Sequence, residues 1–374
     1  MTGRVLFIVP DMVDRPGGIA RVCRLMRRAL VEAGVGLAVV ALHDEKTAPE
    51  GAADEDRPAR YVPCAGSRVA FVWQAFVTAL RYAPSVVLTA HPNFSLLTWC
   101  VARLTGARAV VLVHGVDAWE PLKPLRRWGF RKADMVISVS KFTAERAVQS
   151  NGLSAERVQV LHNCLDPALA RPVPSAGGGS GLSLLTVARM TLAEQYKGHD
   201  YVIRALPELL RRFPKLVYSV VGDGDGRGKL EELAQEIGVA HAVRFHGNVP
   251  EAELPRHYAD ATLFIMPSRG EGFGLAFIEA MAHGKPAIGG NADASPEVIA
   301  DGVTGYVVDP TSVGEIVEKV SRLLADEPLR RRMGQTAAQD VQKRFGYELF
   351  KERLLRHLSR TSPDSVLATE ERRA

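Results

Sequence analysis

Short apolar runs alternate along this chain with longer segments in which apolar residues recur every three or four positions. The first run, Arg4–Pro10, is apolar from Val5 to Val9, which is typical of a strand buried on both faces. The next segment, Ile19–Ala33, has its apolar residues at helical spacing. The same alternation continues towards the end of the chain. Because strands that are separated by helices pair in parallel, the pattern predicts doubly wound α/β sheets.

The alternation predicts a full set of elements. The predicted strands are Arg4–Pro10, Leu37–Leu42, Ser85–Thr89, Ala109–Val113, Met135–Val139, Arg157–His162, Leu182–Ala188, Lys215–Val221, Ala242–Phe245, Ala261–Met266 and Ala287–Gly290. The predicted helices are Ile19–Ala33, Val69–Tyr82, Asn93–Leu104, Lys141–Gln149, Asp200–Phe213, Lys229–Ile237, Glu251–Tyr258, Leu275–His283, Thr311–Asp326, Glu327–Phe345 and Glu348–Leu358.

One segment interrupts the alternation. Residues Asp166–Gly181 hold three prolines and then a Gly/Ser-rich run, the composition of a linker. We therefore predict a first domain over residues 1–166, a linker over 167–181 and a second domain over 182–345, with a last helix and tail over 346–374. Ala48–Arg60 is predicted to be a loop and the polar tail to be disordered. Two doubly wound domains that face each other would form a cleft, a common place for a ligand.

Composition and charge narrow the class of protein. The 374 residues are 47% hydrophobic and 24% charged, as in a globular protein with ample core. The net charge of +5 suits anionic partners such as nucleotide phosphates or a membrane surface, but it is too small to indicate nucleic acid. The four cysteines are far apart and form no C-x-x-C motif, which favours reduced thiols, a cytoplasmic setting and no zinc site. The first apolar run is too short for a signal peptide or a membrane span.

The most informative stretch is Pro267–Pro286. A predicted strand leads into a loop with three glycines, and the predicted helix Leu275–His283 follows. Such a junction directs unpaired backbone N–H groups at a ligand above the sheet edge, which favours an anion. Two carboxylates flank it, Glu271 in the loop and Glu279 about two turns into the helix. Together these features suit a ligand with both phosphates and hydroxyls, such as a nucleotide sugar.

The same stretch carries a family resemblance. The run E-G-F-G-L-A-F-I-E from Glu271 to Glu279, followed by A-M-A-H-G-K-P, resembles the motif of the retaining GT-B glycosyltransferases of family 4. The resemblance implies a GT-B fold, with two Rossmann-like domains facing across a cleft and a C-terminal helix that returns to the N-terminal domain. It also implies retaining transfer of a hexose from a UDP- or GDP-sugar to a hydroxyl of a glycan, glycolipid or natural product, with no metal and no cofactor.

Two cations follow the first predicted strand of the second half. Arg189 and Lys197 suit a diphosphate, because Arg presents a planar fork of donors and Lys a point charge. The resemblance places an Arg and then a Lys-Gly at this position. A solvated basic loop is the alternative.

The segment Gly222-Asp-Gly-Asp-Gly226 has two interpretations. Its Asp223-x-Asp225 pattern could bind Mg²⁺ or Mn²⁺, as the D-x-D motif of the GT-A fold does. Alternatively Gly222 and Gly224 face the nucleotide, as the family resemblance implies. We favour the second interpretation, without a metal, because GT-A enzymes have one nucleotide-binding domain and this chain shows two. No acidic residue at the next strand end supports an NAD site.

In the first half, Gly17 and Gly18 precede a helix, a weak signal for a phosphate site on its own. The resemblance implies that this pair lies near the donor phosphates and the acceptor. It also implies that His114, which follows a predicted strand, hydrogen-bonds a donor hydroxyl near the reacting carbon, with Asp117 as a second candidate. A lone His is otherwise more often a packed core or rim residue.

The resemblance assigns the remaining donor contacts. It implies that Glu271 binds sugar hydroxyls and that Glu279 accepts both ribose hydroxyls. The predicted catalytic residues are His114, Arg189, Lys197 and Glu271. The predicted donor-binding residues are Gly17, Gly18, Gly222, Gly224, Gly247, Asn248, Phe273, Gly274, Leu275 and Glu279. The loop Asn291–Ser295 departs from the family's glycine-rich form, which leaves base selectivity and the role of Glu297 open.

Two basic segments bear on the acceptor. Arg21, Arg24 and Arg28 lie on one face of the first helix, and Leu122–Lys132 interleaves apolar and basic residues, as an interfacial helix at an anionic membrane does. A solvated basic face over a core stripe explains the same pattern. The membrane interpretation implies a lipid-linked acceptor and a peripheral position on the inner face of the cell membrane. The rival functions are a sugar-nucleotide 2-epimerase and a non-catalytic nucleotide-sugar-binding protein.

Overall fold

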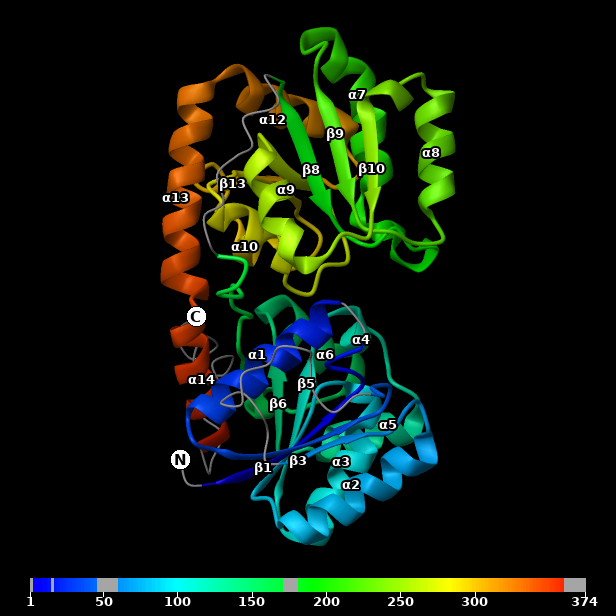
Figure 1. Ribbon diagram of the computed structural model, residues 1–374, viewed down its shortest axis with the longest axis vertical. Coiled ribbons are helices and arrows are strands. Elements are labelled where there is room, and N and C mark those ends of the chain that lie inside the picture. The colour runs from blue at the N-terminus through cyan, green and yellow to red at the C-terminus, as the bar shows by residue number, and fades with distance from the viewer. Residues whose placement is uncertain (1–2, 15–16, 46–59, 171–180, 360–374) are drawn as a thin grey trace. The chain divides into compact units, whose positions relative to one another are not determined.

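The computed structural model describes residues 3–14, 17–45, 60–170 and 181–359, and they form two compact units (Figure 1). The first unit runs to Asn163 and includes the last helix from Glu348, and the second spans Cys164–Tyr347. Most of the predicted linker, nearly all of the predicted loop Ala48–Arg60 and the predicted disordered tail lie outside the described residues.

The first unit is built around seven strands. They are β1 (Arg4–Val9), β2 (Gly36–Ala41), β3 (Arg60–Pro63), β4 (Val86–Thr89), β5 (Arg108–Val113), β6 (Met135–Ser138) and β7 (Val158–Val160). Its helices are α1 (Gly18–Glu32), α2 (Arg68–Tyr82), η2 (Pro92–Phe94), α3 (Ser95–Thr105), α4 (Val116–Trp119), α5 (Pro124–Lys132), α6 (Lys141–Asn151), η3 (Ala155–Arg157) and α14 (Tyr347–Ser359).

The second unit is built around six strands. They are β8 (Ser183–Val187), β9 (Val217–Val221), β10 (Val243–Gly247), β11 (Leu263–Met266), β12 (Ala287–Gly290) and β13 (Gly305–Val308). Its helices are η4 (Leu192–Lys197), α7 (His199–Arg212), α8 (Arg227–Glu236), η5 (Ala240–Ala242), η6 (Glu251–Glu253), α9 (Leu254–Asp260), α10 (Leu275–Ala282), α11 (Ser295–Val298), α12 (Val313–Ala325) and α13 (Glu327–Phe345).

Both sheets are parallel and doubly wound. The strand order is β3-β2-β1-β4-β5-β6-β7 in the first unit and β10-β9-β8-β11-β12-β13 in the second. The order reverses between β1 and β4 and again between β8 and β11. Ligands of such sheets bind outside the carboxyl ends of the strands at these reversals. The predicted fold class is therefore confirmed.

Helices cover both faces of the first sheet. Helices α2 and α3 pack on one face through a cluster that includes Phe71 and Val101, and α5 and α6 extend this layer over β5 and β6. Helix α1 connects β1 to β2 in the opposite direction, and a right-handed crossover places it on the other face. Helix α14 lies beside α1, where Lys351 pairs with Glu32 at 3.0 Å.

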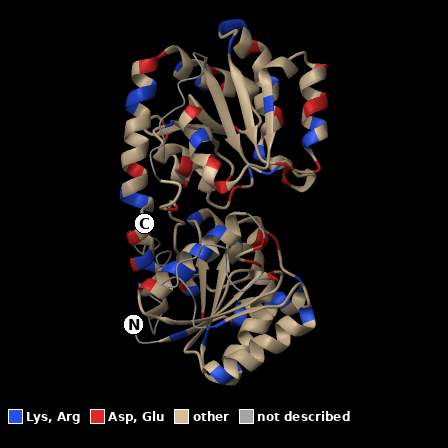
Figure 2. Ribbon diagram, viewed as in Figure 1, with Lys and Arg blue, Asp and Glu red and all other residues tan. Residues whose placement is uncertain are grey.

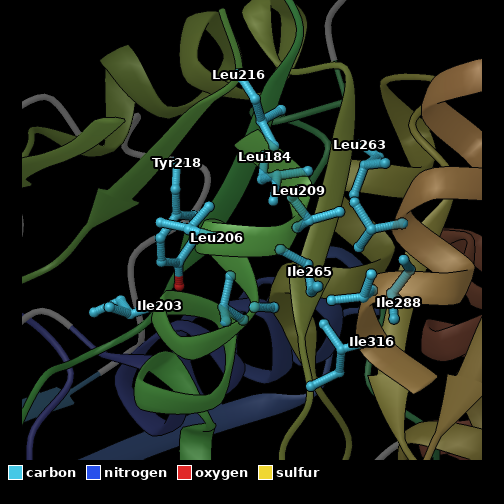
Figure 3. Close-up of a cluster of buried hydrophobic side chains, with 14 of the residues drawn as sticks. Leu184, Ile203, Leu206, Leu209, Leu216, Tyr218, Leu263, Ile265, Ile288 and Ile316 are labelled. Atoms are coloured by element: carbon cyan, nitrogen blue, oxygen red, sulfur yellow. The ribbon is translucent and has the colours of Figure 1, made fainter. Parts of the chain in front are cut away.

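The core of the second unit lies between its sheet and helices α7 and α12. Figure 3 shows this cluster, in which Leu206 and Leu209 of α7 and Ile316 of α12 pack on strand residues such as Ile265. Burial of such aliphatic side chains is the main force that stabilises the unit. On the other face, Phe277 of α10 packs edge-on against Phe264 of β11, with ring centroids 5.5 Å apart. The packing fixes α10, and therefore the loop before it, on β11.

The structure contains elements that the sequence pattern did not predict. Strands β3 and β13 form outer edges of the two sheets. Strand β3 contains Arg60 and Pro63 and is only half-buried, so it leaves no apolar run. Helix α5 lies within Leu122–Lys132, the segment for which an interfacial helix was considered.

The four cysteines are unpaired. Within the described ranges, no helix combines the length and the apolar character needed to cross a bilayer.

Substitution of Gly290 tests how one close backbone contact contributes to the stability of the second unit. A Cβ atom at Gly290 would lie 1.8 Å from the carbonyl oxygen of Ser268, the residue that opens the loop after β11. We expect Gly290→Ala to lower the free energy of unfolding by about 1–3 kcal/mol, because one of the two backbone segments must move. Gly314→Ala is the matched control: it lies in α12 with no atom within 4 Å, and alanine favours a helix. Equal urea midpoints for the two variants would contradict the close packing.

Candidate active site

Lys197 and Glu271 meet at the strand-order reversal of the second sheet. Lys197 ends η4, the segment after β8, and Glu271 lies in the loop after β11, the neighbouring strand. The Lys197 ammonium donates to Glu271 Oε1 in an ion pair. Their side chains are only 15% and 13% exposed. The structure therefore brings together two of the predicted catalytic residues at the edge where this class of sheet binds ligands.

The surroundings of Lys197 lower its pKa and so favour its neutral form. The pKa of Lys197 is lowered to about 8, chiefly by burial, and the positive charge of Arg189 acts in the same direction. Glu194 and Asp293 act in the opposite direction. Arg189 itself is largely exposed and pairs with Glu194. Each cation of the site is thus paired with a carboxylate, Arg189 near the surface and Lys197 further inside.

A buried aspartate fixes the loop that carries Glu271. Asp293 Oδ2 accepts from the backbone N–H of Glu271 at 2.7 Å, and its Oδ1 accepts from the N–H and the hydroxyl of Ser295 at 2.9 and 2.6 Å. Burial raises the pKa of Asp293 to about 6. The glycine-rich loop is also tied to Ser268, whose hydroxyl accepts from Gly270 N–H at 3.1 Å. Asp293 lies in the loop Asn291–Ser295, which departs from the family's glycine-rich form, and no sequence pattern indicated this role.

Glu279 is buried and hydrogen-bonded. It lies in α10 with 3% of its surface exposed, and the Tyr258 hydroxyl donates to its Oε2 at 2.7 Å. The Tyr258 ring stacks on His283, with centroids 5.7 Å apart. Tyr258 was not predicted as a site residue, because only the folded chain brings α9 beside α10. Tyr258 orients Glu279, the carboxylate that the family resemblance assigns to the ribose.

The start of α10 is a local site for negative charge. Gly274 is the N-cap in the left-handed region, at φ 91°, and no side chain caps the helix. The first N–H groups, from Leu275 on, therefore have no side-chain cap partner. Phe273 has 2% of its surface exposed, and its ring packs edge-on against Phe345 at 5.3 Å. A ligand could therefore contact the backbone of Phe273 rather than its ring.

The glycine loop after β9 packs tightly on the segment that carries Arg189. A Cβ at Gly222 would lie 2.1 Å from Ala188 O, and one at Gly224 would lie 2.5 Å from Met190 O. Gly222 N–H also donates to Gly247 O at 2.8 Å. Both glycines are therefore required by the contact between two loops. Asn248 is exposed beside this loop.

The two aspartates of this loop hydrogen-bond to backbone. Asp225 Oδ1 accepts from Leu192 N–H at 2.7 Å, and Asp223 Oδ1 accepts from Gly224 N–H at 2.9 Å. Among the described residues, no three His, Cys, Asp or Glu side chains lie close enough together to hold a metal ion. Asp225 thus joins the loop to the start of η4, and Asp223 bonds within the loop itself.

In the first unit, His114 lies at the carboxyl end of β5. Its Nε2 donates to Ala90 O at 2.9 Å, and burial lowers the pKa of His114 to about 4, with His91 adding to the effect. The ring is therefore neutral near pH 7, with a free electron pair on Nδ1. Asp117 accepts from the N–H groups of His114 and Gly115 at 3.0 and 2.7 Å, and burial raises the pKa of Asp117 to about 7.

Gly17 and Gly18 begin α1 at the carboxyl end of β1. Gly17 is the N-cap, at φ 154°, and the helix has no side-chain cap. The preceding segment is held by buried Asp44, which accepts from the N–H groups of Met12 and Asp14 at 2.9 and 3.0 Å. The sequence did not single out Asp44. Gly17, Gly18 and His114 thus lie at the carboxyl edge of the first sheet, and the other predicted site residues belong to the second unit.

Comparisons with known proteins place the chain in a family. Residues 16–169 match the family described as Glycosyltransferase Family 4, and residues 183–340 match the family described as Glycosyl transferases group 1. The GDP-mannose-dependent alpha-(1-6)-phosphatidylinositol monomannoside mannosyltransferase of Mycolicibacterium smegmatis is 36% identical over 252 residues, 63% of this chain and 65% of the relative. The enzyme of the same name from Mycobacterium tuberculosis is 32% identical over 273 residues, 68% of this chain and 70% of the relative.

Solved structures agree on the fold. Anabaena HepE in complex with UDP matches with a TM-score of 0.79 at 20% identity, over 95% of this chain and 99% of HepE. Sucrose-phosphate synthase of Thermosynechococcus elongatus matches with a TM-score of 0.77 at 21% identity, over 95% and 99%. Two doubly wound sheets with glycine-rich loops at their carboxyl ends define an α/β protein of the GT-B fold. Within that class, the chain belongs to glycosyltransferase family 4, as its sequence motif predicted.

The hydrogen bond between Tyr258 and Glu279 can be tested by substitution. We expect Tyr258→Phe to lower the free energy of unfolding by about 1–3 kcal/mol, because it deprives a buried carboxylate of a hydrogen-bond donor. Tyr201→Phe is the control, since the Tyr201 hydroxyl makes no hydrogen bond with any residue that the structure describes. Denaturant unfolding measures both. A loss for Tyr258→Phe no larger than for Tyr201→Phe would show that the hydroxyl does not support Glu279.

Proposed function

We propose that this protein is a retaining hexosyltransferase that moves a sugar from a nucleotide diphosphate donor to a hydroxyl of a glycolipid or glycan acceptor. The observation that carries the proposal is the buried Lys197–Glu271 pair at the strand-order reversal of the second sheet. A cation and a carboxylate at this edge match a donor with a diphosphate on one side and sugar hydroxyls on the other.

In the proposed reaction the second unit binds the donor. Lys197, Arg189 and the N–H groups at the start of α10 stabilise the negative charge that develops on the leaving diphosphate. Glu271 accepts hydrogen bonds from sugar hydroxyls. Glu279, oriented by Tyr258, accepts from the ribose. Gly222, Gly224, Gly247 and Asn248 lie beside the base or the phosphates.

The first unit supplies the acceptor side and one donor contact. His114 is neutral near pH 7, so its Nδ1 can accept a hydrogen bond from a sugar hydroxyl near the reacting carbon. Gly17 and Gly18 offer backbone N–H groups to the donor phosphates or the acceptor. We propose front-face attack in which the leaving phosphate takes the acceptor proton, without a metal ion and without a covalent enzyme intermediate.

The relatives' names suggest where to look for the substrates. Two of them are named as GDP-mannose-dependent and as acting on a phosphatidylinositol mannoside. GDP-mannose is therefore the first donor to test, and a lipid-linked acceptor on the inner face of the cell membrane is the first acceptor. UDP-sugars come second, since HepE was solved with UDP. The comparisons do not favour the alternative 2-epimerase.

A panel of nucleotide sugars tests the proposal directly. We expect one GDP- or UDP-sugar to raise the melting temperature clearly more than the others, because a ligand that binds only the folded state stabilises it in proportion to its affinity. The same donor should be consumed when an acceptor glycolipid is present. Thermal-shift assays and product chromatography measure the two effects. No stabilisation by any common hexose donor would refute the proposed function.

Two lysine variants, assayed with the donor that the panel identifies, test the role of Lys197. Lys197→Ala is expected to reduce kcat by about 10²–10³-fold, the usual effect of removing one group that stabilises developing charge. Lys215→Ala, at an exposed position after α7, should leave kcat unchanged. Undiminished transfer by Lys197→Ala would exclude this lysine from the phosphate site.

The depressed pKa of Lys197 predicts the alkaline limb of the activity profile. Below pH 8 the free enzyme carries the ammonium charge, and above pH 8 it loses that charge, so kcat/KM should fall as the pH rises through about 8. Arginine keeps its charge over this range, so Lys197→Arg should move the limb to higher pH even if its maximal rate is lower. An alkaline limb at the same pH in both proteins would assign it to another group.

A further inference from the structure

Three adjacent helices of the first unit carry no acidic residue. Helices α2, α3 and α5 contain no Asp or Glu, whereas they contain seven cations (Figure 2). Arg68 and Arg81 lie on α2 and Arg103 on α3. The others lie on α5: Arg126, Arg127, Arg131 and Lys132. We call the outer side of this layer the α2–α3–α5 face.

The same face exposes large apolar side chains. Of the ten large hydrophobic residues that are exposed in the described parts of the chain, seven belong to these helices. Trp73 is 66% exposed and Leu125 is 71% exposed. The others are Val69, Val72 and Leu80 on α2, Leu104 on α3 and Trp128 on α5. A surface that is both apolar and uniformly basic is unusual for a face that meets only water.

Close packing holds α3 and α5 together as one rigid surface. A Cβ at Gly129 of α5 would lie 2.5 Å from the Cα of Leu96 in α3, so only glycine allows this approach. At the same crossing, the Ser95 hydroxyl donates to Arg126 O at 2.6 Å. The two helices therefore present their exposed residues in a fixed arrangement.

A pocket of about 620 Å³ opens between α3 and α5. Two tryptophans line it, with ring centroids 4.6 Å apart, together with four cations. These side chains are Trp99, Trp128, Arg103, Arg131, Lys132 and Arg157. None of the four cations forms an ion pair with a residue that the structure describes. The pocket's one carboxylate, Asp134, accepts from Ala109 N–H at 2.7 Å. The cations are therefore available to an external anion.

The pocket lies away from the carboxyl edge of the sheet. It is lined by Ala109 at the start of β5 and by Asp134, which precedes β6, so it belongs to the amino ends of the strands. Helix α5 connects the two edges: near its start, Arg126 donates to Asn93 Oδ1 at 2.8 Å, beside His91 at the end of β4. The α2–α3–α5 face thus extends from the pocket to the edge at which His114 lies.

We propose that the α2–α3–α5 face docks on an anionic phospholipid bilayer and that the pocket binds one phosphate-bearing headgroup. The inference builds on the lipid-linked acceptor proposed above. Charge complementarity selects this partner, because an anionic leaflet attracts cations and its interfacial region accepts tryptophan and leucine side chains. The arginines of α1 are less suited: Arg28 pairs with Glu32 at 2.7 Å, and Arg24 donates to Met12 O at 3.3 Å.

Vesicle flotation of the full-length protein tests this proposal. We expect the wild type to bind vesicles of phosphatidylcholine mixed with phosphatidylglycerol and to bind pure phosphatidylcholine much less, with binding that weakens as salt rises. The four tryptophans of the chain all belong to the first unit, so tryptophan emission should shift to shorter wavelength on binding.

Two pairs of substitutions separate charge from apolar contact. Arg103→Glu with Arg131→Glu should weaken binding to the mixed vesicles by roughly tenfold or more. Trp73→Ser with Leu125→Ser should weaken it while leaving its salt dependence in place. Arg211→Glu with Lys215→Glu changes the net charge equally in the second unit, at exposed positions, and should leave binding unchanged. Thermal melting of each variant verifies that it is folded.

Three results would overturn the proposal. The wild type could bind equally well with and without phosphatidylglycerol, the variants of the α2–α3–α5 face could bind vesicles as well as the wild type, or the Arg211→Glu/Lys215→Glu control could lose as much binding as they do. A dimeric wild type that becomes monomeric in the surface variants would instead assign the face to a second copy of the chain. Stabilisation by the donor should persist in every surface variant. Loss of vesicle binding with intact donor binding would refute only the docking face, whereas no donor binding in the wild type would refute the proposed function.

Discussion

The ion pair between Lys197 and Glu271 is the interaction on which the second unit's site depends. Both side chains are nearly buried, and burial of opposite charges costs more free energy than their attraction returns unless further groups hold them in place. The surrounding loops supply those groups, above all Asp293, which fixes the Glu271 backbone. In the proposed reaction a donor diphosphate competes for Lys197 and releases Glu271 to the sugar. In that proposal the ion pair is the ligand-free state of the site.

The glycines after β9 show that one sequence pattern can have two physical causes. A Gly-x-Gly after a strand suggests that a nucleotide approaches the backbone. In the structure, the space beside Gly222 and Gly224 is filled by the backbone of Ala188 and Met190. The contact places Arg189 between these two residues and beside the loop. Gly222 and Gly224 therefore allow the loop after β9 to pack closely on the segment after β8, and this packing requires no ligand.

Much of the fold, but less of the site, could be predicted from the sequence. The stretch from β11 to α10 was predicted in the right order, because a buried strand, a glycine loop and a helix followed by Gly284 and Pro286 each leave a local pattern. Strands β3 and β13 were missed, and β3 leaves no apolar run because it contains Arg60 and Pro63 and is only half-buried. Asp293 and Tyr258 were missed for another reason. Each acts on a residue about 20 positions away, and no local pattern records such a pairing.

The two edges of the first sheet have opposite electrostatic character, and this contrast links the site to the surface. At the carboxyl edge, burial keeps His114 neutral and raises the pKa of Asp117 to about 7, so these two side chains carry less charge than usual near neutral pH. At the amino edge, the pocket between α3 and α5 gathers four cations, none of which pairs with a carboxylate that the structure describes. In the proposed docking, the cations at the amino edge hold a phosphate of the bilayer while the acceptor hydroxyl approaches the carboxyl edge. Helix α5 spans the distance between them on one rigid element, so a phosphate held at one edge is compatible with a hydroxyl presented at the other.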